Sequence, residues 1–227
     1  MTQFKTRLIA ALLATAAITT AGSAAAATNL IVNGDFELGN TGFYSSYTFS
    51  PGDLWAPAVY DVAKDPHLDH SSFTSFGDHT TGSGKMMEIN GSETNHATVW
   101  GENNIALTAN TNYLFSFWMA SEYPSSPAIL RLNINGVGQG PAFNAVSTTG
   151  LWTQYSTTWN SGANTHADFA LWNENLAYSG NDFALDDISL AAGGVPEPAT
   201  WALLLTGFFG MGSMLRANRR QLARVTI

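Results

Sequence analysis

Two adjacent carboxylates, Asp186 and Asp187, have a spacing that bears directly on chemistry. They fall in an apolar run, residues 183–190, that has the length and composition of a β-strand. Consecutive side chains of a strand point to opposite faces, so we expect these carboxylates to diverge. They therefore cannot flank one glycosidic bond, which requires two carboxyl groups ~5–10 Å apart across a cleft. A site for a hard cation such as calcium, which takes oxygen ligands, suits such acids better.

Histidines are concentrated in one segment, where aspartates alternate with them: His67, His70, His79 and His96. Their spacing does not match the H-E-x-x-H pattern of zinc enzymes, and the composition of the segment indicates loops. We therefore expect solvated loop histidines rather than zinc ligands. The chain has no cysteine, which excludes disulfides, thiolate metal sites and cysteine nucleophiles.

Tryptophans and asparagines suit the recognition of neutral polyols, because aromatic faces stack on sugar rings and amides bind hydroxyl groups. Tryptophans also fill the cores of β-sandwiches, and we assign Trp118 to the core. Trp172 alternates with two apolar neighbours and shares its face with Asp168 and Glu174, so we expect it to point outward. Trp159 and Arg131 are further candidates for ligand contact.

The charge distribution divides the chain into three parts. Residues 28–195 contain three basic and sixteen acidic residues, a formal net charge of −13, whereas the whole chain has −8. Six of the nine basic residues lie in the first seven or the last twelve positions. Such an acidic central part repels phosphates, which argues against nucleic acid as a partner.

The N-terminus has the pattern of a secretory signal peptide. Two basic residues precede an apolar run, residues 8–18, and small residues end in an A-x-A site at residues 25–27. Eleven residues rise about 16 Å as a helix, short of a ~30 Å hydrocarbon core. We therefore expect residues 1–27 to be removed on export.

The C-terminus combines a linker (residues 193–198), an uncharged segment (residues 199–215) and a basic tail (residues 216–227). Seventeen uncharged residues meet the lower limit for a spanning helix, and the arginines predict a cytoplasmic tail. Pro196, Glu197 and Pro198 before the helix, with Arg216, Arg219 and Arg220 after it, resemble the PEP-CTERM sorting signal of Gram-negative bacteria. The resemblance implies a partner, an exosortase, that processes the chain near the Pro-Glu-Pro motif after transient anchoring in the inner membrane. It also implies a final location at the cell surface or outside the cell, near exopolysaccharide or biofilm.

The central part, residues 28–192, has the pattern of an all-β domain. Short apolar alternations separated by Asn, Gly, Ser, Thr and Pro predict nine strands: 29–32, 55–62, 85–89, 98–107, 113–121, 128–134, 152–159, 167–172 and 183–190. Asn135-Gly136 predicts a turn. Nine strands in a domain of this length favour one antiparallel β-sandwich of the jelly-roll type.

Residues 29–37 (NLIVNGDFE) and 180–190 (GNDFALDDISL) resemble the opening and closing strands of galactose-binding-like sandwiches, which include many carbohydrate-binding modules. The resemblance covers the whole central domain. It implies a structural calcium ion held where the first and last strands meet. The matching positions are Glu37, with Asp187 or Asp186 from the closing strand and Asp35 as a further ligand.

We therefore expect an exported, noncatalytic protein whose domain associates with extracellular polysaccharide. A structural or adhesive matrix protein without a sugar pocket is the first alternative. A polysaccharide hydrolase is the second, and it would require two carboxylates facing each other across a cleft.

Overall fold

The computed structural model describes residues 28–193. The predicted signal peptide, Pro-Glu-Pro motif, C-terminal apolar segment and arginine cluster lie outside the described residues. Within residues 28–193 no helix has the length and apolar character needed to cross a membrane.

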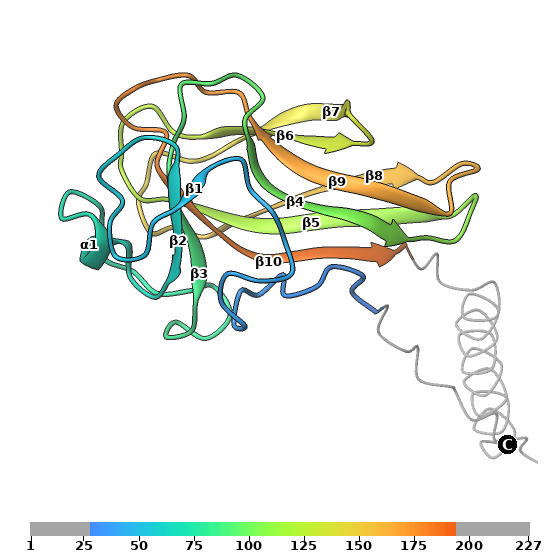
Figure 1. The fold of residues 1–227 in the computed structure, drawn as a ribbon, viewed down its shortest axis with the longest axis horizontal. Coiled ribbons are helices and arrows are strands. Elements are labelled where there is room, and N and C mark those ends of the chain that lie inside the picture. Colours follow the sequence, from blue (N-terminus) through green and yellow to red (C-terminus); the bar gives the residue numbers. More distant parts are fainter. Residues whose placement is uncertain (1–27, 194–227) are drawn as a thin grey trace, which may run out of the picture.

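Two β-sheets pack face to face, as Figure 1 shows, and confirm the predicted all-β sandwich. Neighbouring strands pair antiparallel except β1 and β2, which are parallel. The six-stranded sheet has the order β1 (Thr48–Phe49), β2 (Val59–Ala63), β3 (Met86–Asn90), β10 (Phe183–Ala192), β5 (Asn112–Ser121) and β8 (Thr153–Asn160). The four-stranded sheet has the order β4 (Thr98–Ala106), β9 (His166–Asn173), β6 (Ile129–Ile134) and β7 (Val137–Asn144).

The core lies between the sheets and follows the alternation expected from the sequence. Alternate side chains of β5 and β6 are buried: Tyr113, Phe115, Phe117 and Met119 from β5, and Leu130, Leu132 and Ile134 from β6. Phe115 stacks on Phe169 of β9 with ring centroids 6.0 Å apart, which joins the two sheets. Each large apolar side chain that is fully buried contributes about 1.5–3 kcal/mol to stability. This core holds the domain without disulfides.

The opening segment, residues 29–32, is not the strand that we predicted. It lies along β10, where the Leu30 N–H donates to the carbonyl of Leu190 at 2.8 Å. The Asn29 side chain also bonds the backbone of β10, donating to Ile188 and accepting from Leu190. Asn33 and Phe36 take positive φ angles of 55°, which end any extended conformation. Side-chain bonds and turns thus replace a regular ladder.

The hairpin of β6 and β7 contains one feature that the sequence predicts and one that it does not. Asn135 and Gly136 both have positive φ, 52° and 81°, and join β6 to β7 by the tight turn that their sequence predicts. β7 itself was not predicted, because it contains Gly138, Gly140 and Pro141, residues that are depleted in strands.

Residues 64–85, which include α1 (Pro66–Asp69), cover the outer face of the six-stranded sheet. His79 of this segment stacks on Trp118 of β5, with ring centroids 3.7 Å apart. The N-cap of α1 is Asp65, whose carboxylate accepts a hydrogen bond from the His67 N–H. Figure 1 shows α1 at one end of the sandwich and the last residues of β10 at the other. The loops beside α1 and before β10 therefore meet at the same end.

A candidate ligand-binding pocket

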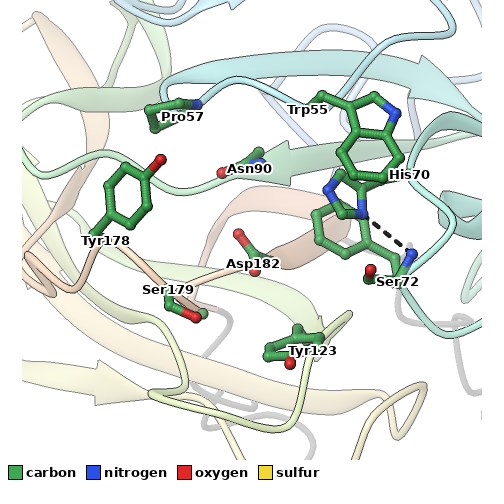
Figure 2. Close-up of a pocket in the computed structure, with 11 residues that line it drawn as sticks. Trp55, Pro57, His70, Ser72, Asn90, Tyr123, Tyr178, Ser179 and Asp182 are labelled. Carbon is green, nitrogen blue, oxygen red and sulfur yellow. Dashed lines mark hydrogen bonds between the residues drawn. The ribbon is translucent and has the colours of Figure 1, made fainter.

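An open pocket of about 230 Å³ lies at the end of the sandwich where α1 is found. Three segments supply most of its wall: the residues before β2, those after α1 and those before β10. The lining residues are Trp55, Pro57, His70, Ser72, Phe73, Asn90, Tyr123, Tyr178, Ser179, Gly180 and Asp182. Figure 2 shows Asp182 near the middle of the view, with Tyr178 on one side and Trp55 and His70 on the other.

One wall is a stack of three aromatic rings. The His70 ring lies between Trp55, at 3.9 Å between centroids, and Phe73, at 4.2 Å. Phe73 is anchored in a small apolar cluster with Leu54 and Val59. Trp55 itself is 62% exposed, so its outer surface is available to a ligand. Burial lowers the pKa of His70, so this ring is neutral at neutral pH.

The opposite wall and the floor are more polar. Tyr178, 73% exposed, comes from the loop before β10. Asn90 is held by its amide, which donates to the carbonyl of Leu54 at 2.7 Å. The Asp182 carboxyl is 6% exposed and accepts a hydrogen bond from the Gly91 N–H at 3.3 Å. Burial raises its pKa to about 7.

Beneath the pocket lies a buried carboxyl cluster, Asp61, Asp69, Glu88 and Glu122. Asp61 and Glu88 are register partners on β2 and β3, and the α1 segment covers them with Asp69. Both carboxyl oxygens of Glu88, together with one each of Asp69 and Glu122, have no hydrogen-bond partner. Burial, reinforced by the neighbouring acids, raises the pKa of Glu88 to about 9 and that of Asp69 to about 6. The pKa of Glu122 is also raised, chiefly by burial.

Asp186 and Asp187 do not diverge as we predicted. Asp187 has a positive φ of 48°, and the register with β5 shifts between Asp186 and Ser189. This bulge turns both carboxylates toward one loop. The Asp187 carboxylate lies 2.6 Å from Nδ1 of His79, and the Asp186 carboxylate accepts from the His79 N–H at 2.8 Å.

The carboxylates predicted to hold calcium do not converge on one point. Glu37 accepts from the Lys85 N–H at 2.8 Å, and Asp35 accepts from the Glu37 N–H at 3.4 Å. Asp186 and Asp187 instead bond the backbone and side chains of residues 79–80. In the part of the chain that the structure describes, no three His, Asp or Glu side chains are grouped to hold a metal ion. Calcium also takes backbone carbonyl ligands, so this arrangement of side chains does not test the calcium site, which stays a prediction.

Of the three other candidates, Trp172 and Arg131 lie on the four-stranded sheet and Trp159 lies on β8 of the six-stranded sheet. Trp172 of β9 points outward, as expected, and its ring stacks on His96 at 4.8 Å. Arg131 of β6 is its register partner and is paired with Glu174 through a hydrogen bond of 3.1 Å. Trp159 does not join them, because it packs edge-on against the core residue Phe169 at 5.7 Å.

One further sequence expectation was wrong, and another holds only in part. Trp118 is not in the core: it follows the outward alternation of β5 and lies under His79. His67 and His96 are exposed, as expected of solvated loop histidines, whereas His70 and His79 are half-buried against aromatic rings. The imidazole rings of His70 and His79 thus cover part of the surface of neighbouring aromatic side chains.

The aromatic residues of the pocket are not predicted as ligand contacts by the sequence. The pattern of residues 55–62 predicts a strand that begins at Trp55, whereas β2 begins at Val59, and Tyr178 lies in a turn-rich segment without a predicted function. The useful signal was the position of both residues beside turn formers, Pro57 in one case and Gly180 in the other. A large aromatic residue in such a loop has no strand face on which to pack, and it is therefore available for contact.

No protein-family model and no curated protein matches the chain. Solved structures do. An arabinose-bound family 51 α-L-arabinofuranosidase aligns with a TM-score of 0.51 at 15% identity, covering 75% of this chain and 27% of that longer one. The xylan-binding module CBM22-1 from Paenibacillus barcinonensis aligns with a TM-score of 0.48 at 13% identity, and the alignment covers 75% of this chain and 97% of that module. A family 61 carbohydrate-binding module in complex with β-1,4-galactotriose aligns with a TM-score of 0.47 at 16% identity, and the alignment covers 73% of this chain and 99% of that module. At such identities the likeness concerns the fold alone.

Proposed function

We propose that this domain is a noncatalytic carbohydrate-binding module and that the pocket beside α1 is its binding site. The observation that carries the proposal is the exposure of Trp55 and Tyr178 on either side of the polar residues Asn90 and Asp182. Exposed apolar surface that is gathered around polar groups, rather than scattered singly, marks ligand-binding grooves.

The chemistry of the pocket suits a sugar. The apolar face of a pyranose stacks on an aromatic ring, while its hydroxyl groups need fixed donors and acceptors. The Trp55–His70–Phe73 stack supplies the aromatic surface, and the side chains of Asn90 and Asp182 supply the donors and acceptors for the hydroxyl groups. A volume of about 230 Å³ is below the ~300–1,000 Å³ of drug-sized sites, which fits one sugar residue or the end of a chain.

The absence of catalysis is argued from the carboxyl groups of the pocket. Asp182 is the one carboxyl among the lining residues, whereas glycoside hydrolysis uses a facing pair. Glu88 and Glu122 lie close by but are fully buried and have no access to a substrate. The hydrolase alternative therefore has no second group on the described surface of this pocket.

A glycan array with the full-length chain tests the proposal. We expect binding to one class of polysaccharide or oligosaccharide, and we expect Trp55→Ala to abolish it. Trp172→Ala is the matched control, because it removes an equally large ring on the other sheet. Binding that is lost in Trp172→Ala and retained in Trp55→Ala would move the site to the four-stranded sheet. No binding to any glycan would favour the structural or adhesive alternative.

We also propose that the chain is exported and sorted through its C-terminus. The support is the sequence alone: a leading signal peptide pattern, the Pro196-Glu197-Pro198 motif, an uncharged segment and a trailing arginine cluster. Exosortase processing would then place the sugar-binding domain at the cell surface or in an exopolysaccharide matrix. Replacing Glu197 by Ala should leave the unprocessed, larger form in the inner membrane. Processing unchanged by this substitution would contradict the sorting proposal.

The structural calcium ion is a separate proposal, supported only by the acids of the opening segment and β10. It predicts a higher melting temperature in millimolar calcium than in a chelator. Equal melting temperatures would remove calcium from the account without affecting the sugar site.

A further inference from the structure

We infer that the pocket selects a sugar bearing a free amino group, because a stack of aromatic rings and a buried carboxyl group face the same small space, which no lysine or arginine lines. This inference rests on the proposed sugar-binding function. It adds the chemical class of the ligand, a protonated amine rather than a neutral ring.

The aromatic residues have the arrangement that cations favour. Five of the lining residues carry aromatic rings: Trp55, His70, Phe73, Tyr123 and Tyr178. The faces of such rings are negative and attract an ammonium group held within about 6 Å of their centroids. His70 does not oppose this attraction, since burial keeps its imidazole neutral at neutral pH. The exposed rings of Trp55 and Tyr178 are therefore the aromatic surfaces that a cation can reach.

The charged groups point the same way. Asp182 is the one formally charged residue among the lining residues, and it carries no lysine or arginine partner. In residues 28–193 the ion pairs engage Asp187 and Glu174, and none engages the carboxyls at the pocket. Among the described residues, no positively charged side chain therefore pairs with the Asp182 carboxylate. A ligand that brings a positive charge would supply the counter-ion.

The buried carboxyl cluster lies behind the pocket floor, where burial raises the pKa of Glu88 and Glu122 and keeps both groups protonated at neutral pH. Glu122 interacts with Asp182 and with Glu88, and Glu88 interacts with Asp69, so the acids form a continuous row behind the pocket floor. Glu88 is fully buried, and both of its carboxyl oxygens lack a hydrogen-bond partner. Buried polar groups without partners are rare. A cation bound in the adjacent pocket would favour ionisation of these carboxyl groups, because an opposite charge nearby lowers their pKa.

Calorimetric titrations of the full-length chain at pH 7.0 test the inference with three probes of one ring type: glucosamine, glucose and N-acetylglucosamine. Glucosamine is the probe with a free amino group. An amine with the ordinary α-amino pKa of ~7.7–8.0 is mostly protonated at this pH. We expect glucosamine to bind about tenfold more tightly than either neutral sugar, as a cation–π contact with a carboxylate partner allows. Asp182→Asn should bring glucosamine to the level of the neutral sugars. Tyr178→Ala, a change at an exposed side chain that leaves folding intact, should weaken glucosamine at least as much as glucose.

The outcomes separate this inference from the proposed function. Equal affinity for all three sugars, abolished by Trp55→Ala, would overturn the selection of amines and leave sugar binding in the pocket. Binding of tetramethylammonium or calcium, with no binding of any sugar, would overturn both. Glucosamine binding that survives Asp182→Asn unchanged would also contradict the inference, since the charge that it requires would then be elsewhere.

Discussion

Asp182 is the residue on which the ligand chemistry depends, and its ionisation can be followed directly. The groups that face it are Glu122 after β5, Tyr47 before β1, and His70 and two tyrosines across the pocket. Burial raises the pKa of Asp182 to about 7, so the carboxyl changes from neutral to charged within the physiological range.

The affinity for a cation of fixed charge should therefore rise with pH. Tetramethylammonium does not titrate, so any change between pH 5.5 and 8.5 comes from the protein. We expect several-fold tighter binding at pH 8.5 than at pH 5.5, with a midpoint near 7, because only the ionised carboxylate attracts the cation. The same titration of Asp182→Asn should be nearly flat. A pH profile that is unchanged in Asp182→Asn would contradict the assignment.

Glu88 makes a different prediction, on stability. Its folded pKa of about 9 lies above the ordinary value of 4.5, so the folded state holds a proton that the unfolded state releases above pH 4.5. The stability that this group contributes is therefore complete at pH 4.5 and is lost progressively as the pH rises to about 9. Glu88→Gln should stabilise the domain by on the order of 1–3 kcal/mol at pH 8, with no gain at pH 4.5. Urea denaturation at both pH values measures this.

Single residues were also where prediction from the sequence failed. The outward position of Trp172 could be read from the alternation of its strand. The meeting of Asp186 and Asp187 at one loop could not, because it depends on a bulge with positive φ at Asp187. Nor could the buried carboxyl cluster be predicted, since Asp69 comes to Glu88 from the single-turn helix α1, which no strand pattern describes.

Among the elements, the opening segment shows how an irregular stretch can be docked as firmly as a strand. Ile188 of β10 donates to the carbonyl of Gly34 at 2.8 Å, and Asn29 bonds β10 through its side chain. Residues 29–32 have the composition of a strand, and the resemblance of residues 29–37 to an opening strand implied the position beside the closing strand that they take. Their conformation could not be predicted, because the Asn29 side chain competes with the backbone for the same partners.

Gly34 tests this docking. A Cβ atom at Gly34 would lie 2.0 Å from the carbonyl oxygen of Ile188, so the segment or β10 must shift. We expect Gly34→Ala to destabilise the domain by at least about 2 kcal/mol in urea denaturation. Gly136→Ala is the control, since a Cβ there meets nothing within 4 Å and costs only the strain of its positive φ, about 1 kcal/mol. Equal losses in the two variants would mean that the opening segment is not packed against β10.

The strands themselves were predictable to the extent that packing follows a period of two. Eight of the nine predicted strands coincide with a strand of the structure, and their buried faces form the core. β7 was not predicted, because its glycines and proline have low strand propensity. Its pairing with β6 holds it in the extended conformation. The loops at the α1 end, which form the pocket, carry no periodic signal at all.

At the scale of the whole molecule, charge and architecture support one account. A sandwich with a large apolar core carries an excess of acidic residues, with a formal charge of −13 over residues 28–195, part of which belongs to buried acids with a raised pKa. Long-range attraction of cations follows from that charge, and the pocket beside α1 is where aromatic surface and carboxyl groups meet. The sandwich is a scaffold that brings three loops together, and the ligand chemistry belongs to those loops.

The central claim is that sugars bind in the pocket beside α1, and one comparison tests it most directly. It is the calorimetric affinity of the wild type, Trp55→Ala and Trp172→Ala, as full-length chains, for the glycan that the array identifies. We predict that Trp55→Ala lowers the affinity at least tenfold, because an exposed ring that stacks on the sugar is lost, while Trp172→Ala matches the wild type. An unchanged affinity in Trp55→Ala, with its melting temperature preserved, would contradict the account.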